Sequence, residues 1–141
     1  MEILWFFTQS RWLPRFSLAG WLVLCGAAMV VRMGLTAFGA SVLGVLVIAQ
    51  LLHAMTFAAH HAVCIALISE HFPARLRGRG QALFTVIGYG FTGVLGSLGG
   101  GWLSAQFGLA TVYGASLVMA AVGTACAVKV WRLRQAGLAP L

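Results

Sequence analysis

The chain has 141 residues, of which 61% are hydrophobic and only 8% are charged, and its formal net charge is +7. A soluble domain carries about 25% charged residues, so this composition excludes a chain with an ordinary water-exposed surface and predicts an integral membrane protein. The positive charge does not indicate nucleic-acid binding, because the polar segments are too short to build a folded basic face.

Residues 1–16 are predicted to be the end of a helix followed by a loop. Residues 1–8 are apolar apart from Glu2 and would form only about 12 Å of helix, less than half the thickness of a bilayer. We therefore interpret residues 1–8 as a truncated helix end whose beginning is missing. Arg11 and Arg15 follow in residues 9–16, which we expect to be a cytoplasmic loop.

Four long apolar stretches follow, and each has the roughly 20 residues that a helix needs to cross a bilayer. They are residues 17–37, 41–69, 81–105 and 110–130. Every lysine and arginine except Arg32 lies in residues 9–16, 70–80 or 129–141. Because four spans return the chain to its starting side, the two basic loops and the tail over 131–141 are predicted to face the cytoplasm. The predicted fold is an all-α helical bundle in the cell inner membrane, with about four complete spans.

Arg32 lies inside the first span, near its outer end. Its side chain is expected either to snorkel to the external interface or to turn inward, where it would attract an anionic substrate or pair with a carboxylate. Glu2 and Glu70 are the carboxylates of this sequence. Glu70 is expected to form an ion pair beside the basic loop, whereas Glu2 would suit a cavity in an intact protein.

The second span carries most of the polar groups. Projected at 100° per residue, six residues fall within an arc of about 100°, with Thr56 at its edge. The six are Gln50, His53, Phe57, His60, His61 and Cys64. Polar groups on one face of a membrane helix usually point to the bundle interior or to a cavity, and histidine suits proton coupling because its charge changes near neutral pH. Simple hydrogen bonding between helices remains the alternative.

The third span, residues 81–105, has small side chains at every fourth position. These residues are Gly88, Thr92, Gly96, Gly100 and Ser104. Small residues let the backbones of neighbouring membrane helices approach closely. The stripe therefore predicts close helix packing, and a surface on which helices slide during transport is a second interpretation.

No motif of an enzyme or of a metal site is present. The sequence has no nucleophile-elbow, phosphate-binding-loop or zinc-protease pattern, and Cys25, Cys64 and Cys126 are isolated from one another. We expect no catalytic activity, no cofactor and no metal.

An ordered set of segments resembles the major facilitator superfamily, and in particular its phenylpropionate permease-like branch of proton symporters. The segments are Glu2 with the following Ile-Leu-Trp-Phe-Phe, Arg15-Phe16-Ser17, Arg32, the run Gln50 to Phe57 with His61, and Arg77 to Ala82. The resemblance implies a fold of twelve helices in two halves that rock about a central site. This chain would supply the end of helix eight and helices nine to twelve.

The resemblance implies a C-terminal fragment of a proton-coupled symporter for a small organic solute, with an aromatic carboxylate as a candidate substrate. The positions that match the branch, and that we predict to line the substrate and proton pathway, are Glu2, Arg32, Gln50, His53, Thr56, Phe57 and His61. Met55 and His60 depart from the pattern. The expected partners are the bilayer, the solute, protons and a missing N-terminal half. The alternatives are a self-sufficient four-helix protein, such as a dimeric exporter, and a non-transporting membrane subunit.

Overall fold

A computed structural model describes the backbone of residues 2–138 and their side chains except those of residues 2, 4 and 6. All regular elements in this part of the chain are helical, which confirms the all-α prediction. Four helices are long and apolar enough to cross a membrane, namely Leu18–Gly39, Leu43–His71, Ala74–Phe107 and Leu109–Gln135. The Glu2 side chain, predicted to face a cavity, lies outside the described residues.

The N-terminal segment is more helical than the sequence indicated. Helix α1 (Glu2–Trp12) extends into the expected loop over 9–16, and a short 3-10 turn, η1 (Leu13–Arg15), leads to α2 (Leu18–Gly39). Trp12 extends α1 because its indole is buried and its Nε1 donates a 3.0 Å hydrogen bond to the Trp5 carbonyl. Ser17 starts α2 by accepting a 3.0 Å hydrogen bond from the Gly20 backbone N–H, as N-cap residues do.

The second and third spans are each interrupted by a π-helical segment. The second span consists of α3 (Leu43–Ala54), the π-helical η2 (Met55–Ala59) and α4 (His60–His71). The third consists of the 3-10 turn η3 (Ala74–Leu76), α5 (Arg77–Phe84), the π-helical η4 (Thr85–Phe91) and α6 (Thr92–Phe107). Two π-helical segments in four spans are unusual, and such segments frequently occur at functional sites.

The connections between spans are short and have local chemical causes. Most of residues 70–80, expected to be a loop, are helical, and the break is confined to Phe72 and Pro73. Phe72 is extended because the ring of the following proline disfavours helical geometry there. Gly108 separates α6 from α7 (Leu109–Gln135) with a φ of 83°, a value that favours glycine.

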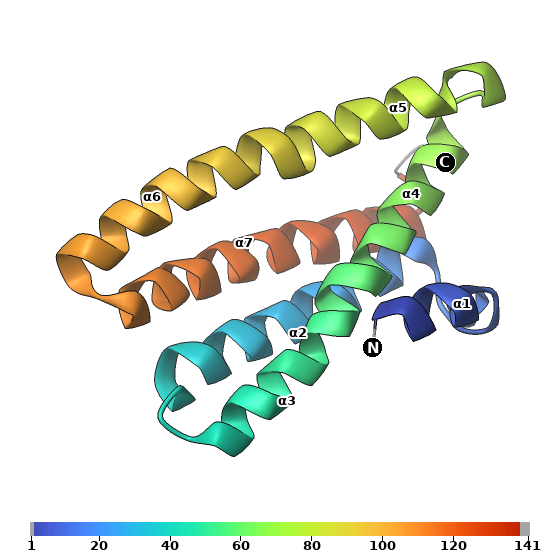
Figure 1. Cartoon of the computed structure of the whole chain (residues 1–141). Helices are drawn as coiled ribbons and strands as arrows, with labels where there is room; N and C mark the ends of the chain where they lie inside the picture. The colour runs from blue at the N-terminus through green and yellow to red at the C-terminus, as the bar shows by residue number, and fades with distance from the viewer. Residues whose placement is uncertain (1, 139–141) are drawn as a thin grey trace.

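Helix α2 is the centre of the packing, with its most extensive contact against α7 and further contacts with α3 and α4. Figure 1 shows α2 and α7 running side by side, with α4 crossing α2. The closest approach of α2 and α7 is at Gly26, where an added Cβ atom would lie 2.6 Å from Thr124 Oγ1 and 3.3 Å from Thr124 Cα. A glycine at this position therefore allows the two backbones to meet.

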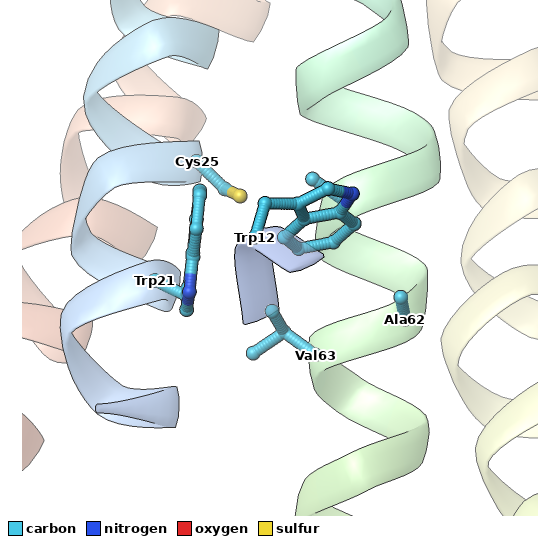
Figure 2. Close-up of a cluster of buried hydrophobic side chains, with 6 residues drawn as sticks. Trp12, Trp21, Cys25, Ala62 and Val63 are labelled. Atoms are coloured by element: carbon cyan, nitrogen blue, oxygen red, sulfur yellow. The ribbon is translucent and has the colours of Figure 1, made fainter. Parts of the chain in front are cut away.

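A cluster of buried side chains joins α1, α2 and α4 at one end of the bundle (Figure 2). The Trp12 and Trp21 rings meet edge to face with their centroids 5.0 Å apart, a preferred aromatic geometry. Trp21 Nε1 also donates a 3.0 Å hydrogen bond to the Leu13 carbonyl. Val63 and Cys25 are the largest fully buried side chains of the cluster, so this end has a tightly packed core.

The third span lies apart from this core. In Figure 1 it approaches α7 at the turn between them and α4 at its other end. None of its most apolar window is buried, compared with 33% in the second span. The stripe expected to pack closely touches α7 at Gly100, where an added Cβ would lie 3.6 Å from Val112 Cγ1. A Cβ atom added to Gly96 would have nothing within 4 Å.

Candidate polar site between the second and third spans

The central feature of the site is a group of rings that spans the second and third helices. We call His53, Phe57, His61, Phe84 and Tyr89 the histidine–aromatic cluster. The His53 and Phe57 rings are stacked with centroids 5.5 Å apart, and Phe57 meets Tyr89 edge to face at 6.3 Å. Phe84 in turn meets Tyr89 edge to face at 5.4 Å. The rings therefore form a continuous set of contacts from the middle of the second span to the third span.

A hydrogen bond joins the two spans inside this cluster. His61 Nδ1 and Tyr89 Oη lie 3.2 Å apart, and their rings are tilted with centroids 5.7 Å apart. The imidazole and the phenol can each donate or accept, depending on the protonation of the imidazole. The contact can therefore persist whether or not His61 carries a second proton.

Both π-helical segments contribute to the cluster or border it. Phe57 lies within η2 and Tyr89 within η4, and Phe84 directly precedes η4. A π-helical turn widens the helix locally and changes the direction of the side chains that follow. Phe57 of η2 and Tyr89 of η4 meet edge to face, so the two segments lie next to each other at the cluster.

Arg32 points toward the second span. Its Nη1 donates a 3.3 Å hydrogen bond to Thr56 Oγ1, and Thr56 Oγ1 donates one of 3.2 Å to the His53 carbonyl. Of the two interpretations of Arg32, the inward orientation is therefore the one that the structure adopts. Among the described side chains no carboxylate pairs with Arg32.

Not every predicted pathway residue lies with the cluster. Gln50 is exposed and lines a pocket of about 380 Å³ together with Arg32, Thr36 and Tyr113. His60, which was not predicted for the pathway, lines a pocket of about 510 Å³ together with Thr56 and Phe84, and its Nε2 lies 3.7 Å from Cys64 Sγ. Of the second-span residues predicted for the pathway, the structure thus places His53, Phe57 and His61 in the cluster and Thr56 beside it.

Glu70 forms the expected ion pair, but with a residue of the C-terminal helix. Arg134 Nη1 lies 3.6 Å from Glu70 Oε2, and Arg134 Nη2 donates to His71 Nε2 at 3.3 Å. His71 Nδ1 donates a 2.8 Å hydrogen bond to the Leu67 carbonyl, which leaves Nε2 as the acceptor. This group fastens the end of α4 to the end of α7.

Tyr89 and Phe84 were not predicted as site residues. The sequence held one signal, because Tyr89 is a polar aromatic residue flanked by Gly88 and Gly90 within an apolar span. The repeat of small residues in that span instead directed attention to helix packing. Tyr113 of α7, which lines the Arg32 pocket, was not predicted either, because a single tyrosine in an apolar span forms no pattern.

The fold and this interior polar site define a multi-pass membrane protein with ionisable groups between its helices. The sequence profile of the MFS_1 like family matches residues 1–115. The chain therefore belongs to the MFS_1 like family and is a member of the major facilitator superfamily, whose function is membrane transport. No curated protein and no solved structure gave a match. The phenylpropionate permease-like branch stays a prediction.

Proposed function

We propose that this chain is part of a proton-coupled symporter for a small organic solute in the cell inner membrane. The observation that carries the proposal is the histidine–aromatic cluster, in which His61 and Tyr89 connect two spans by a hydrogen bond. Ionisable residues within membrane helices are costly unless they face partners or a cavity, and they often mark ion and substrate pathways. His53 and His61 are the groups that would carry the proton.

An aromatic carboxylate is the substrate class that the side chains favour. Phe57, Phe84 and Tyr89 offer ring faces and edges against which an aromatic ring can pack. Arg32 offers a guanidinium whose hydrogen-bond partner in the second span is the neutral Thr56 hydroxyl. A guanidinium and a carboxylate form strong, often bidentate hydrogen bonds, so the solute's anionic end would pair with Arg32 and its ring with the cluster.

A second set of helices would complete the pathway. Alternating access requires a site between two repeats that move relative to each other, and the third and fourth spans have no buried residue in their most apolar windows. We propose that an N-terminal half covers part of these surfaces, and that the C-terminus and both basic segments, 9–16 and 70–80, face the cytoplasm. Reporter fusions after Gly39 and after Gly108 should then both report an external location, and a cytoplasmic signal at both would contradict this topology.

Transport is tested in proteoliposomes with an imposed proton gradient and radiolabelled phenylpropionate. Two preparations are compared. One is the 141-residue chain alone, and the other is the protein expressed from a gene that also includes the DNA immediately upstream of the first codon of this chain. We expect saturable, proton-dependent uptake only in the second preparation. Saturable uptake by the chain alone would contradict the need for a second set of helices, and no uptake in either would contradict the substrate class.

The role of the cluster is tested by replacing His61 with glutamine and Tyr89 with phenylalanine in the preparation that transports. We expect His61→Gln to flatten the pH dependence of uptake between about pH 5 and 8, where histidine usually titrates, while protein yield is kept. Tyr89→Phe keeps the ring and removes the hydroxyl, so it should shift the pH profile without abolishing binding. His71→Gln is the control for the histidine variants, because His71 lies exposed at the end of α4, away from the cluster and from Arg32. Wild-type pH profiles in His53→Gln, His61→Gln and Tyr89→Phe would leave these groups a purely structural role.

A further inference from the structure

A groove separate from the histidine–aromatic cluster lies at the end of the bundle where α2 begins and α7 ends. Its volume is about 580 Å³. Residues from both helices and from the segment before α2 line it, including Arg15, Gly20, Leu24, Ala27, Trp131 and Gln135. The proposed transport mechanism uses none of these residues.

The groove changes from polar to apolar along α2. Arg15 and Gln135 supply charge and hydrogen bonding at its mouth, and Val23, Leu24 and Ala27 supply an apolar wall farther along the helix. From residue 17 to residue 27 the helix rises about 15 Å, about half the thickness of the hydrocarbon core. Among the described side chains that line the groove none is acidic. A ligand with a negative head and an apolar tail would match this gradient.

Trp131 provides a hydrogen-bond donor inside the groove. Its Nε1 lies 3.9 Å from the point where a Cβ atom on Gly20 would stand, so the absence of a side chain at Gly20 leaves space beside the indole N–H. Among the described hydrogen bonds, Trp12 and Trp21 donate to carbonyl groups, whereas none has Trp131 as its donor. Tryptophan at a membrane interface commonly has its ring in the apolar region and its N–H toward polar headgroup atoms.

We propose that this groove binds an anionic phospholipid. The phosphate would pair with the Arg15 guanidinium, an ester oxygen would accept the hydrogen bond of Trp131 Nε1, and an acyl chain would lie along Val23, Leu24 and Ala27. The assignment to a lipid follows from the combination of the basic mouth with the apolar wall, since a free anion would use only the mouth. The bound lipid would connect the start of α2 to the end of α7.

The test measures quenching of tryptophan fluorescence by phospholipids with brominated acyl chains, using the purified 141-residue chain in detergent–lipid micelles. Dibrominated phosphatidylglycerol should quench at lower mole fractions than dibrominated phosphatidylcholine. The excess quenching should disappear in Trp131→Phe, which removes the fluorophore that faces the groove. Equal quenching by the two lipids in the wild-type chain would overturn the proposal.

Two variants test the two parts of the proposal separately: Arg15→Gln tests the contact with the headgroup, and Gly20→Val tests the space inside the groove. Arg15→Gln should weaken phosphatidylglycerol binding about fivefold, the factor expected for one basic residue near an anionic headgroup. The matched control is Arg79→Gln, since Arg79 is an exposed arginine of the other basic segment and does not line the groove. Gly20→Val fills the space beside Trp131 and should reduce quenching by both lipids. An equal loss in Arg79→Gln, unchanged quenching in Gly20→Val, or complete displacement of the lipid by inorganic phosphate would each overturn the proposal.

Discussion

Glycine has opposite roles in α2 and in α6. In α2, Gly26 lies against the backbone of Thr124, and an added Cβ would collide with it. In α6, a Cβ atom added to Gly93, Gly96, Gly99 or Gly101 would have nothing within 4 Å, and one added to Gly100 would make only an ordinary contact with Val112. A glycine-rich membrane helix is therefore not necessarily a closely packed one. Close packing requires that a partner backbone face the glycine, and α7 does so along α2.

The largest loss of stability is expected from a substitution in the buried cluster that joins α1, α2 and α4. Trp21→Ala removes a buried ring, its edge-to-face contact with Trp12 and its hydrogen bond to the Leu13 carbonyl. We expect a loss of about 3 kcal/mol in the free energy of unfolding, measured by titration with a denaturing detergent. This value is at the low end for a buried tryptophan, because lipid is as apolar as the protein interior and mainly packing is lost.

Trp102→Ala is the control for this prediction, since Trp102 lies in the third span and is 61% exposed. It should change the unfolding free energy by less than about 0.5 kcal/mol. Equal losses for the two variants would show that the third span is as well packed as the first.

The second largest loss of stability is expected at the contact of α2 with α7. Gly26→Ala places a Cβ atom 2.6 Å from Thr124 Oγ1, and the contact with Thr124 Cα prevents relief by a side-chain rotation alone. We expect the unfolding free energy to fall by about 1–3 kcal/mol, as overpacking does elsewhere. Thermal unfolding in detergent micelles measures this change.

Gly123→Ala is the matched control, because it adds the same methyl group to the facing helix, one residue from Thr124, where nothing lies within 4 Å. It should leave the free energy of unfolding unchanged. Combining Gly26→Ala with Thr124→Ala removes the nearest atom and should recover part of the loss; no recovery would indicate that α2 and α7 meet elsewhere.

A smaller effect is expected in the third span, where two glycines of one stripe can be compared directly. Gly100→Leu must displace Val112 and should lower the unfolding free energy by about 1 kcal/mol. Gly96→Leu enters open space and should have little effect. A larger loss for Gly96→Leu than for Gly100→Leu would show that the stripe packs along its whole length, as the sequence suggested.

The smallest loss of stability is expected from a substitution at the ends of α4 and α7. Arg134→Gln removes the ion pair with Glu70 and the hydrogen bond to His71. Because the Glu70 side chain is 49% exposed, water screens the pair, and we expect a loss of only about 0.2–1 kcal/mol that disappears at high salt. Arg132→Gln, two residues earlier on the same helix, should show no such loss, and a salt-independent effect in Arg134→Gln would contradict an electrostatic origin.

The sequence predicted the spans well because their signals are local. Long apolar stretches, Pro73 and Gly108 define four helices and their connections, and the family resemblance at superfamily level is confirmed by the profile match. The basic segments were expected to be loops because transferring a charged side chain into lipid costs free energy. Polar residues can nevertheless continue a helix beyond the bilayer, and most of residues 70–80 do so.

The residues that meet across helices were predicted less well. The arc of polar residues assumes a constant 100° per residue, which does not hold across the π-helical η2. His61 contacts Tyr89, whereas His60 contacts Cys64. Two orientations of Arg32 were compatible with the sequence, and the structure has the inward one, in which Arg32 donates a hydrogen bond to Thr56.

The sequence by itself determined that this protein crosses a membrane, that it has four long apolar segments, and which of them carries its histidines. Each of these follows from hydropathy, charge or backbone chemistry within one segment. The tertiary structure alone decided that Tyr89 lies beside His61, that Gly26 meets Thr124 and that a Cβ atom at Gly96 would meet no other atom within 4 Å. The physical reason is that lipid is as apolar as a helix surface. Hydrophobicity therefore places each helix in the bilayer but does not specify its partner, which shape and hydrogen bonding between distant segments must select.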